Sequence, residues 1–305
     1  MWLRMKGKPL IFRNRLSFSI ACSIFRWSCF VCLMLCDPVL FGQDTTVRLS
    51  SAAAASKVAS VPSVSTSADV TTASRWPYVE RIGQFQVHST VPIAKLEKHL
   101  LYLSTLPTEL ANTLAISIAE QPIHLVVLES RESLDNYVKR LLPDAISRRA
   151  LYIRHRGPGL VLTYFNAAWV TDARHECTHA LLDASRVKVP QWLDEGLAEY
   201  FETASTNPLK HATHGAAVQS QVRYGQVADI QQLENTDSNT TLTAKDYRDA
   251  WSITAFALNS SDQTRAIFQK YLQDLQNERA AGLLSHRLQP ALHSWREDFT
   301  QFFRR

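Results

Sequence analysis

Two histidines four residues apart lie in a stretch of sequence that is compatible with one continuous helix. The stretch runs from Thr171 to Ser185 without a Pro or Gly, and its centre is His175-Glu176-Cys177-Thr178-His179. Residues four apart lie on the same helix face, so both imidazoles can point at one metal ion. Thr171 or Asp172 is a suitable N-cap for this helix. The sequence therefore predicts a helix that presents two metal-ligating side chains.

A third ligand is expected on a second short helix, which the sequence predicts after Pro190, over residues 191–202. Glu195 lies on it, 16 positions after His179, and this length of chain lets the second helix fold back against the first. Two imidazoles and one carboxylate leave a position of a tetrahedral zinc ion open for water, as in catalytic zinc sites. We therefore expect His175, His179 and Glu195 to bind Zn²⁺. A purely structural zinc site would normally have four protein ligands, which disfavours that alternative.

Four acidic residues are candidates for supporting roles at this site. Glu176 follows the first ligand and is the candidate general base for a metal-activated water. Glu199 and Glu202 lie one and two turns after Glu195 on the same helix face, so either can orient His175 or His179 from the second shell of ligands. Asp183, four residues after His179, is a weaker option for the same role.

An oxyanion that develops during carbonyl chemistry also requires a hydrogen-bond donor. Tyr247 is the candidate, because it lies near the start of a later predicted helix that begins at Asp246. The alternatives are Tyr224, His211 and His214. Cys177 lies two positions from each histidine and faces away from the metal, so we interpret it as a small buried hydrophobic residue.

The two motifs together resemble those of the gluzincin zinc metallopeptidases, the peptidase-MA-like group. The resemblance covers about Ile123 to Leu258 and depends on H-E-x-x-H at 175–179 and W-L-x-E-G-x-A-x-Y at 192–200. The aminopeptidase N branch has a similar W-L-x-E-G-x-A element whose Glu is the third zinc ligand, and the matching position is Glu195. An uncharacterised planctomycete envelope family with the same two motifs is also similar. The resemblance implies a zinc peptidase that acts on a peptide or protein substrate.

The resemblance to the aminopeptidase branch does not extend upstream of the first motif. That branch has a Gly-Ala-Met-Glu-Asn element that binds the amino terminus of the substrate. The corresponding region here is His155-Arg156-Gly157-Pro158-Gly159, which predicts a turn. We therefore expect an endopeptidase. The alternative is a catalytically inactive zinc-containing module that binds a peptide or a wall component of the cell envelope.

The first 43 residues have the pattern of a targeting segment. Six basic residues precede or adjoin a short apolar run, Trp27 to Leu35, which predicts a secretory signal peptide. An uncleaved membrane anchor that begins at Leu16 is the alternative, although Arg26 near its middle would cost about 3 kcal/mol. Residues 44–74 are rich in Ser, Ala and Thr, which predicts a disordered linker. One domain, residues 75–305, remains, and we expect it to be exported to the periplasm, cell envelope or exterior.

Charge and cysteine content support this division. The chain has 33 basic and 28 acidic residues, and residues 1–43 hold six basic residues and one acidic residue, so the remainder carries 27 of each. The basic excess belongs to the leader and gives no reason to expect nucleic-acid binding. Four of the five cysteines also lie in the leader, which leaves Cys177 without an internal disulfide partner. The sequence gives no basis for an oligomeric state.

Apolar patterns along residues 75–305 predict the α+β class, with a small N-terminal mixed sheet and its helices followed by a helical half that carries the zinc motifs. Strands are expected at 85–88, 123–128, 150–153 and 160–164, the last two as a hairpin. Helices are expected at 96–120 and 131–142. We expect an edge strand such as 160–164 to align an extended peptide beside the zinc.

Overall fold

The computed structural model describes residues 76–143, 148–154, 158–203, 213–237 and 240–304. The predicted leader and linker, residues 1–74, lie outside these ranges, as do His211 and residues 155–157 of the predicted turn. Among the described residues, none of the helices combines the length and the apolar character needed to cross a membrane.

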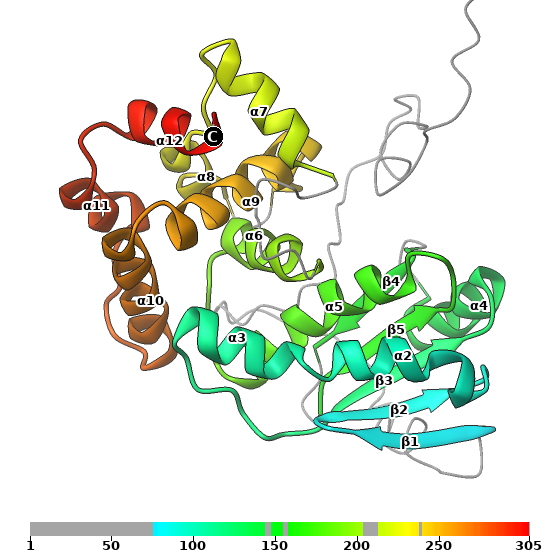
Figure 1. Cartoon of the computed structure of the whole chain (residues 1–305). Coiled ribbons are helices and arrows are strands. Elements are labelled where there is room, and N and C mark those ends of the chain that lie inside the picture. Colours follow the sequence, from blue (N-terminus) through cyan, green and yellow to red (C-terminus); the bar gives the residue numbers. More distant parts are fainter. Residues whose placement is uncertain (1–75, 144–147, 155–157, 204–212, 238–239, 305) are drawn as a thin grey trace, which may run out of the picture. The chain divides into compact units, whose positions relative to one another are not determined.

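The strands and helices follow one another in the order that the sequence pattern predicts, with most strands before most helices. The strands are β1 (Tyr78–Ile82), β2 (Phe85–Ser89), β3 (Ile123–Leu128), β4 (Ala150–Ile153) and β5 (Leu160–Tyr164). The helices are α2 (Ile93–Leu103), α3 (Leu106–Leu114), α4 (Arg131–Leu141), α5 (Trp169–Ala184), α6 (Gln191–Phe201), α7 (Gly215–Arg223), α8 (Ile230–Glu234), α9 (Ala244–Asn259), α10 (Asp262–Gln276), α11 (Leu284–Leu288), the 3-10 helix η4 (Gln289–Ala291) and α12 (Trp295–Phe303). The predicted α+β class is confirmed (Figure 1).

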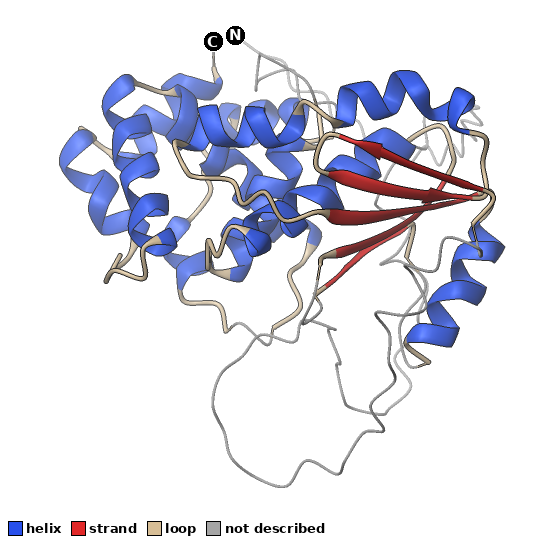
Figure 2. Cartoon of the chain, turned by 90° about the horizontal axis from the view of Figure 1, so that it is seen from below, coloured by secondary structure: helices blue, strands red, loops and turns tan. Residues whose placement is uncertain are grey.

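The five strands found among the described residues form one mixed sheet in the order β1-β2-β3-β5-β4. A tight turn joins β1 to β2, and Gly83 adopts a φ of 57° there, a conformation that glycine reaches without steric cost. The β2, β3 and β5 strands run parallel, while β4 lies antiparallel to β5. Figure 2 shows the strands side by side, with most of the helices gathered beside them. Among the described strands, β1 and β4 therefore lie at the two edges of the sheet.

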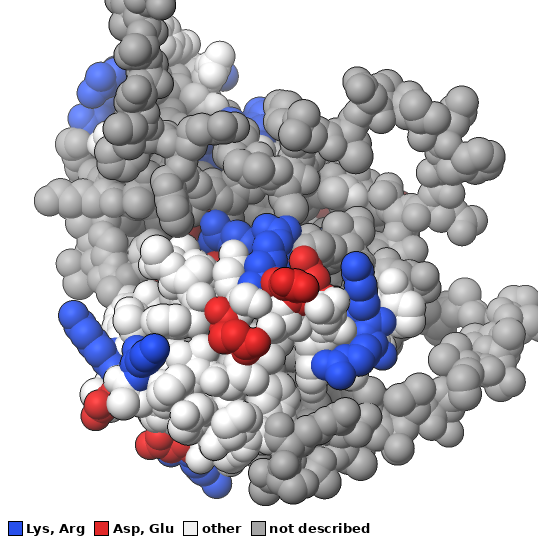
Figure 3. Space-filling view, turned by 90° about the vertical axis from the view of Figure 1, so that its right-hand side faces the viewer, with Lys and Arg blue, Asp and Glu red and all other residues white. Residues whose placement is uncertain are grey.

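Alternate residues of the central strands pack on opposite faces of the sheet. In β3, Leu125 and Val127 join the large core that α2, α3 and α5 cover. Val126 and Leu128 point the other way, into a smaller core that also contains Leu134 of α4. On the side of the molecule shown in Figure 3, basic and acidic side chains are interspersed and do not form a patch of one sign.

Three predictions about local structure are wrong. The helix expected at 96–120 is two helices, because Pro107 lacks an N–H and begins a new helix, and Ala115 ends it with a φ of 53°. The strand expected at the edge, β5, lies between β3 and β4, so β4 is the edge strand on that side. The α5 helix begins at Trp169, before Thr171 and Asp172, and its N-cap is Ala168.

The fall in the free energy of unfolding at acid pH should depend on a buried histidine. His88 of β2 is 3 % exposed and packs against the rings of Trp76 and His124. Burial, together with the charge of His124, lowers the pKa of His88 to about 4. Between about pH 6.5 and about pH 4, the unfolded chain therefore binds a proton at His88 that the folded chain does not bind. The stability that the neutral, buried His88 contributes is present above pH 6.5 and is lost as the pH falls towards 4.

We expect His88→Gln to flatten the fall in unfolding free energy over this pH range, as measured by urea denaturation at several pH values. His293→Gln is the matched control, because the side chain of His293 is 87 % exposed. An equal slope in the His88 variant and the wild type would contradict the assignment.

Candidate metal centre

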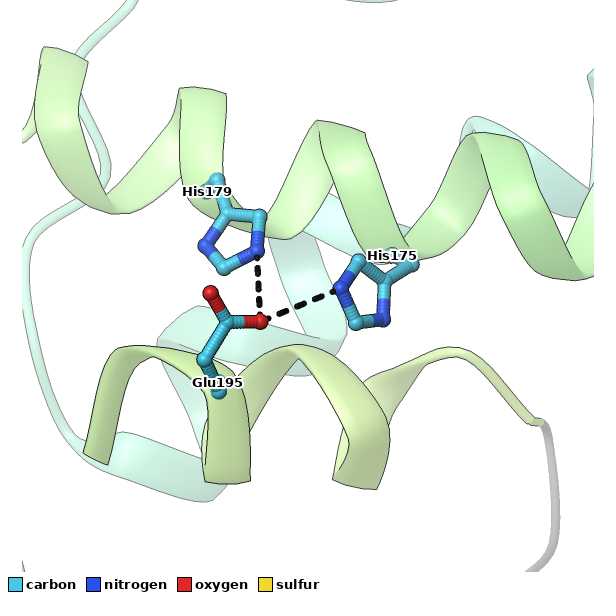
Figure 4. Close-up of side chains that lie close together, drawn as sticks. All are labelled: His175, His179 and Glu195. Carbon is cyan, nitrogen blue, oxygen red and sulfur yellow. Dashed lines mark ion pairs between the residues drawn. The ribbon is translucent and has the colours of Figure 1, made fainter. Parts of the chain in front are cut away.

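Two neighbouring helices bring the three predicted ligands together. The α5 helix carries His175 and His179 one turn apart, and α6 carries Glu195 opposite them (Figure 4). The Nε2 atoms of both histidines lie 3.5 Å from Glu195 Oε2. One donor atom from each of the three residues lies within 4.8 Å of the others, so the group could hold a metal ion.

The outer nitrogens of the two imidazoles each face another carboxylate. His175 Nδ1 lies 3.1 Å from Glu202 Oε2, and His179 Nδ1 lies 3.0 Å from Asp194 Oδ1. A carboxylate at Nδ1 favours a proton on that nitrogen, so a neutral ring, the form that binds a metal ion, directs its Nε2 lone pair at the centre. The donor set therefore fits a divalent ion such as zinc, with two nitrogens and one oxygen facing inward and a carboxylate beside the outer nitrogen of each histidine.

The carboxylates also set the electrostatics of the centre. Burial alone would lower the pKa of His179, but the charges of Asp194 and Glu195 outweigh it and raise the pKa to about 10. Burial likewise opposes protonation of His175, while hydrogen bonds to Glu195 and Glu202 raise its pKa well above the ordinary value. Both shifts report a strongly negative local potential, which favours a cation between the ligands.

The other predicted carboxylate, Glu199, takes part in a different contact. Its Oε2 lies 3.0 Å from Nε2 of His214, whose ring packs against Trp251 of α9. His175, Glu199 and Glu202 form a second group of potential ligands. That group would use Nδ1 of His175, which faces Glu202, whereas the first group uses Nε2 and keeps Glu202 in its orienting role. The group formed by His175, His179 and Glu195 is therefore the better candidate for holding a metal ion.

A buried arginine beside the first ligand joins the two ligand-bearing helices. Arg174 is fully buried, and its Nε donates to the carbonyl oxygen of Phe201 at 2.8 Å. Its guanidinium also binds Glu109 of α3 and lies over the ring of Tyr102 of α2 at 4.4 Å. Arg174 directly precedes His175, and Phe201 directly precedes Glu202. The Arg174–Phe201 and His175–Glu202 contacts are thus consecutive links between α5 and α6.

The α9 helix approaches α6 directly behind the third ligand. A Cβ on Gly196 would lie 2.6 Å from the carbonyl oxygen of Ala250, so only glycine permits this approach. Tyr247 lies one turn before Ala250 on the same face of α9 and is half-buried. Burial raises the pKa of the Tyr247 hydroxyl, and the charge of Glu195 raises it further. Tyr247 therefore lies on the helix that packs directly against α6 beside Glu195.

The remaining candidates are placed as follows. Glu176 Oε2 accepts a hydrogen bond from the backbone N–H of Tyr152 in β4 at 2.7 Å. Asp183 accepts from the Tyr152 hydroxyl at 2.6 Å and pairs with Arg154, so its described contacts are with β4. Tyr224 is 82 % exposed at the end of α7, which argues against a role at the centre. Cys177 is fully buried in the main core, as predicted.

Sequence reasoning missed Asp194 and Arg174. Asp194 directly precedes the third ligand, and an acidic residue there was a usable signal, but its partner depends on how α6 is rotated against α5. Arg174 precedes the first ligand, and an arginine is mostly exposed in proteins, so no local pattern predicts its burial.

Comparison with known proteins does not assign the chain to a family. No protein-family model matches the chain, and no curated protein matches it significantly.

Removing the Glu202 carboxylate should weaken metal binding although it is not a ligand. Loss of such an outer partner typically costs 10- to 100-fold in affinity, so we expect Glu202→Gln to raise the zinc dissociation constant by about that factor. Glu199→Gln is the matched control: it makes the same chemical change one turn away, at the partner of His214, and should have a smaller effect. Competition with a chromophoric chelator measures both constants. Equal losses in the two variants would contradict the assignment of Glu202.

Proposed function

We propose that this chain is a zinc-dependent peptidase that cleaves within peptides or proteins. The observation that carries the proposal is the convergence of His175, His179 and Glu195, with the outer nitrogen of each histidine facing its own carboxylate. The resemblance of the two motifs to gluzincin peptidases supports the same conclusion. On this proposal the ion is Zn²⁺ and the protein is exported, either free or tethered to a membrane through its N-terminus.

The chemistry would divide among residues of three helices. Zinc, when bound, supplies Lewis acidity and makes a water molecule more acidic. Glu176 is adjacent to His175 on α5 and would accept a proton from the attacking water, then deliver it to the leaving amine. The Tyr247 hydroxyl, whose raised pKa keeps it protonated at neutral pH, would donate a hydrogen bond to the oxygen that gains negative charge.

The edge strand β4 is the proposed element for aligning the substrate. An extended peptide can add to a free sheet edge by main-chain hydrogen bonds, independently of most side chains. β4 packs against α5 and provides the backbone N–H that binds Glu176, so this edge is beside the candidate general base. This corrects the expectation for β5, which is paired on both sides. The proposed substrate class is therefore a peptide or protein segment in extended conformation.

The same contact supports a second candidate function. Glu176 is engaged by the Tyr152 N–H, and a carboxylate fixed in that position does not serve as a base. A zinc-containing module that binds peptides or wall components without cleaving them would have the same ligands. Cleavage of a randomised peptide library, abolished by a chelator and restored by zinc, would exclude this alternative.

Replacing the candidate general base tests the mechanism. We expect Glu176→Gln to lower peptide hydrolysis by about 10³-fold, because the amide cannot accept the proton of the attacking water. Zinc content, measured by elemental analysis of the purified full chain, should stay near one ion per chain. Undiminished hydrolysis in this variant would rule out the proposed role.

Tyr247→Phe should lower kcat by about 10²-fold with little change in KM, because a lost oxyanion donor acts mainly on the transition state. Zinc content should again be unchanged. Tyr224→Phe serves as the control, since Tyr224 is 82 % exposed and should leave both constants unaltered. An equal effect of the two substitutions would remove Tyr247 from the mechanism.

A further inference from the structure

One residue of the edge strand contacts the metal-bearing helix at two points. The backbone N–H of Tyr152 donates to Glu176 Oε2 at 2.7 Å, and its hydroxyl donates to Asp183 Oδ2 at 2.6 Å. Glu176 and Asp183 are seven residues apart, which places them two turns apart on one face of α5. A Cβ on Gly159 would lie 3.2 Å from the Tyr152 ring, so the absence of a side chain there makes room for the ring. Tyr152 is therefore fixed from three directions.

The N–H of Tyr152 points away from β5, towards the edge of the sheet where no described strand pairs with β4. Tyr152 lies opposite Val161 of β5, yet its N–H is donated to Glu176 on the other side. In an antiparallel pair, alternate residues direct both backbone groups away from the partner strand, so Ala150 shares this orientation. An extended peptide that added to β4 would direct a main-chain carbonyl at the same N–H.

The strand itself is restrained on both sides of this position. Arg149 pairs with Asp172, and Arg154 pairs with Asp183, so two ion pairs join β4 to α5 around Tyr152. The Glu176 side chain, in contrast, reaches the N–H through rotatable single bonds. When a peptide carbonyl and Glu176 compete for this one donor, the carboxylate is the group that moves.

We propose that the Tyr152 N–H is a shared site, occupied by Glu176 in the free protein and by a main-chain carbonyl of the peptide in the complex. Peptide binding then releases Glu176 towards the metal centre, so Tyr152 couples recognition of an extended main chain to the availability of the general base. This inference rests on the proposed function for the role of Glu176. The competition for the N–H is a binding property and can be measured without catalysis.

Two variants that remove the general base separate binding from cleavage. Glu176→Gln keeps an acceptor for the Tyr152 N–H, whereas Glu176→Ala removes it, and both changes remove the same charge. The probe is a mixture of N-acetylated, C-amidated hexapeptides randomised over uncharged residues. We expect the mixture to bind Glu176→Ala about five-fold more tightly than Glu176→Gln. In the alanine variant, no side chain at position 176 competes with the peptide for the Tyr152 N–H, and one hydrogen bond accounts for a difference of this size. Equal affinities would overturn the proposal.

The Tyr152 amide itself reports on the contact. Selective ¹⁵N-tyrosine labelling of the full chain, which contains nine tyrosines, gives a sparse spectrum in which Tyr152→Phe identifies the Tyr152 signal by its loss. We expect this signal to shift in Glu176→Ala, where the donor loses its acceptor, and to shift again when the hexapeptide mixture binds. Peptide binding that moves other tyrosine signals and leaves this one unchanged would also overturn the proposal.

Proline substitution then removes the donor. Tyr152→Pro and Tyr152→Ala both lose the ring and the hydroxyl, but only the proline variant loses the N–H, which the pairing with β5 does not use. In the Glu176→Ala background, we expect the proline variant to bind the mixture about five-fold more weakly than the alanine variant. Equal binding by two folded variants would contradict the shared site, and the amide spectra decide the question if the proline variant does not fold. Full hydrolysis by Glu176→Gln would instead refute the proposed function and leave these binding results intact.

Discussion

The buried guanidinium of Arg174 fixes the relative position of the helices on which the candidate metal centre depends. A charged group without solvent must have its donors satisfied, and here the acceptors come from α3, from the end of α2 and from the last turn of α6. These partners belong to both halves of the fold, so one side chain connects the helices over the sheet to the helix that carries Glu195. The spacing of His175 and Glu202 follows from the adjacent Arg174–Phe201 link.

The centre also gathers several carboxylate groups in a mostly buried region. Asp194, Glu195 and Glu199 lie on α6 and Glu202 is its C-cap; Glu195, Glu199 and Glu202 are less than a tenth exposed. The imidazoles of His175, His179 and His214 contact these carboxylates. A divalent ion bound there would offset part of the repulsion, so its binding would also stabilise the packing of α5 against α6. This matters for a chain whose described residues contain a single cysteine and no disulfide.

The periodicity of the sequence predicted single helices and buried strands, because these depend on neighbouring residues. The spacing of His175 and His179 needs only the helical repeat, and the apolar runs of β3 and β5 identify buried strands by composition. The order of strands in the sheet depends on long-range pairing, and for that reason the edge was assigned to β5 instead of β4. The choice between Glu199 and Glu202 depends on the rotation of α6 against α5, since both lie on the face of Glu195. Asp194 was missed for the same reason.

The close crossing of α6 and α9 has a consequence for recognising distant relatives of this chain. The Ala250 carbonyl would lie 2.6 Å from any Cβ at Gly196. A glycine directly after Glu195 therefore indicates that a helix from a later part of the sequence, α9, crosses α6 closely at this point. A protein with the histidine pair and the glutamate but a larger residue after it must separate the two helices, and it would lose the placement of a tyrosine such as Tyr247. The Glu-Gly dipeptide therefore discriminates between chains that share only the two histidines and the glutamate and chains that share the surrounding architecture.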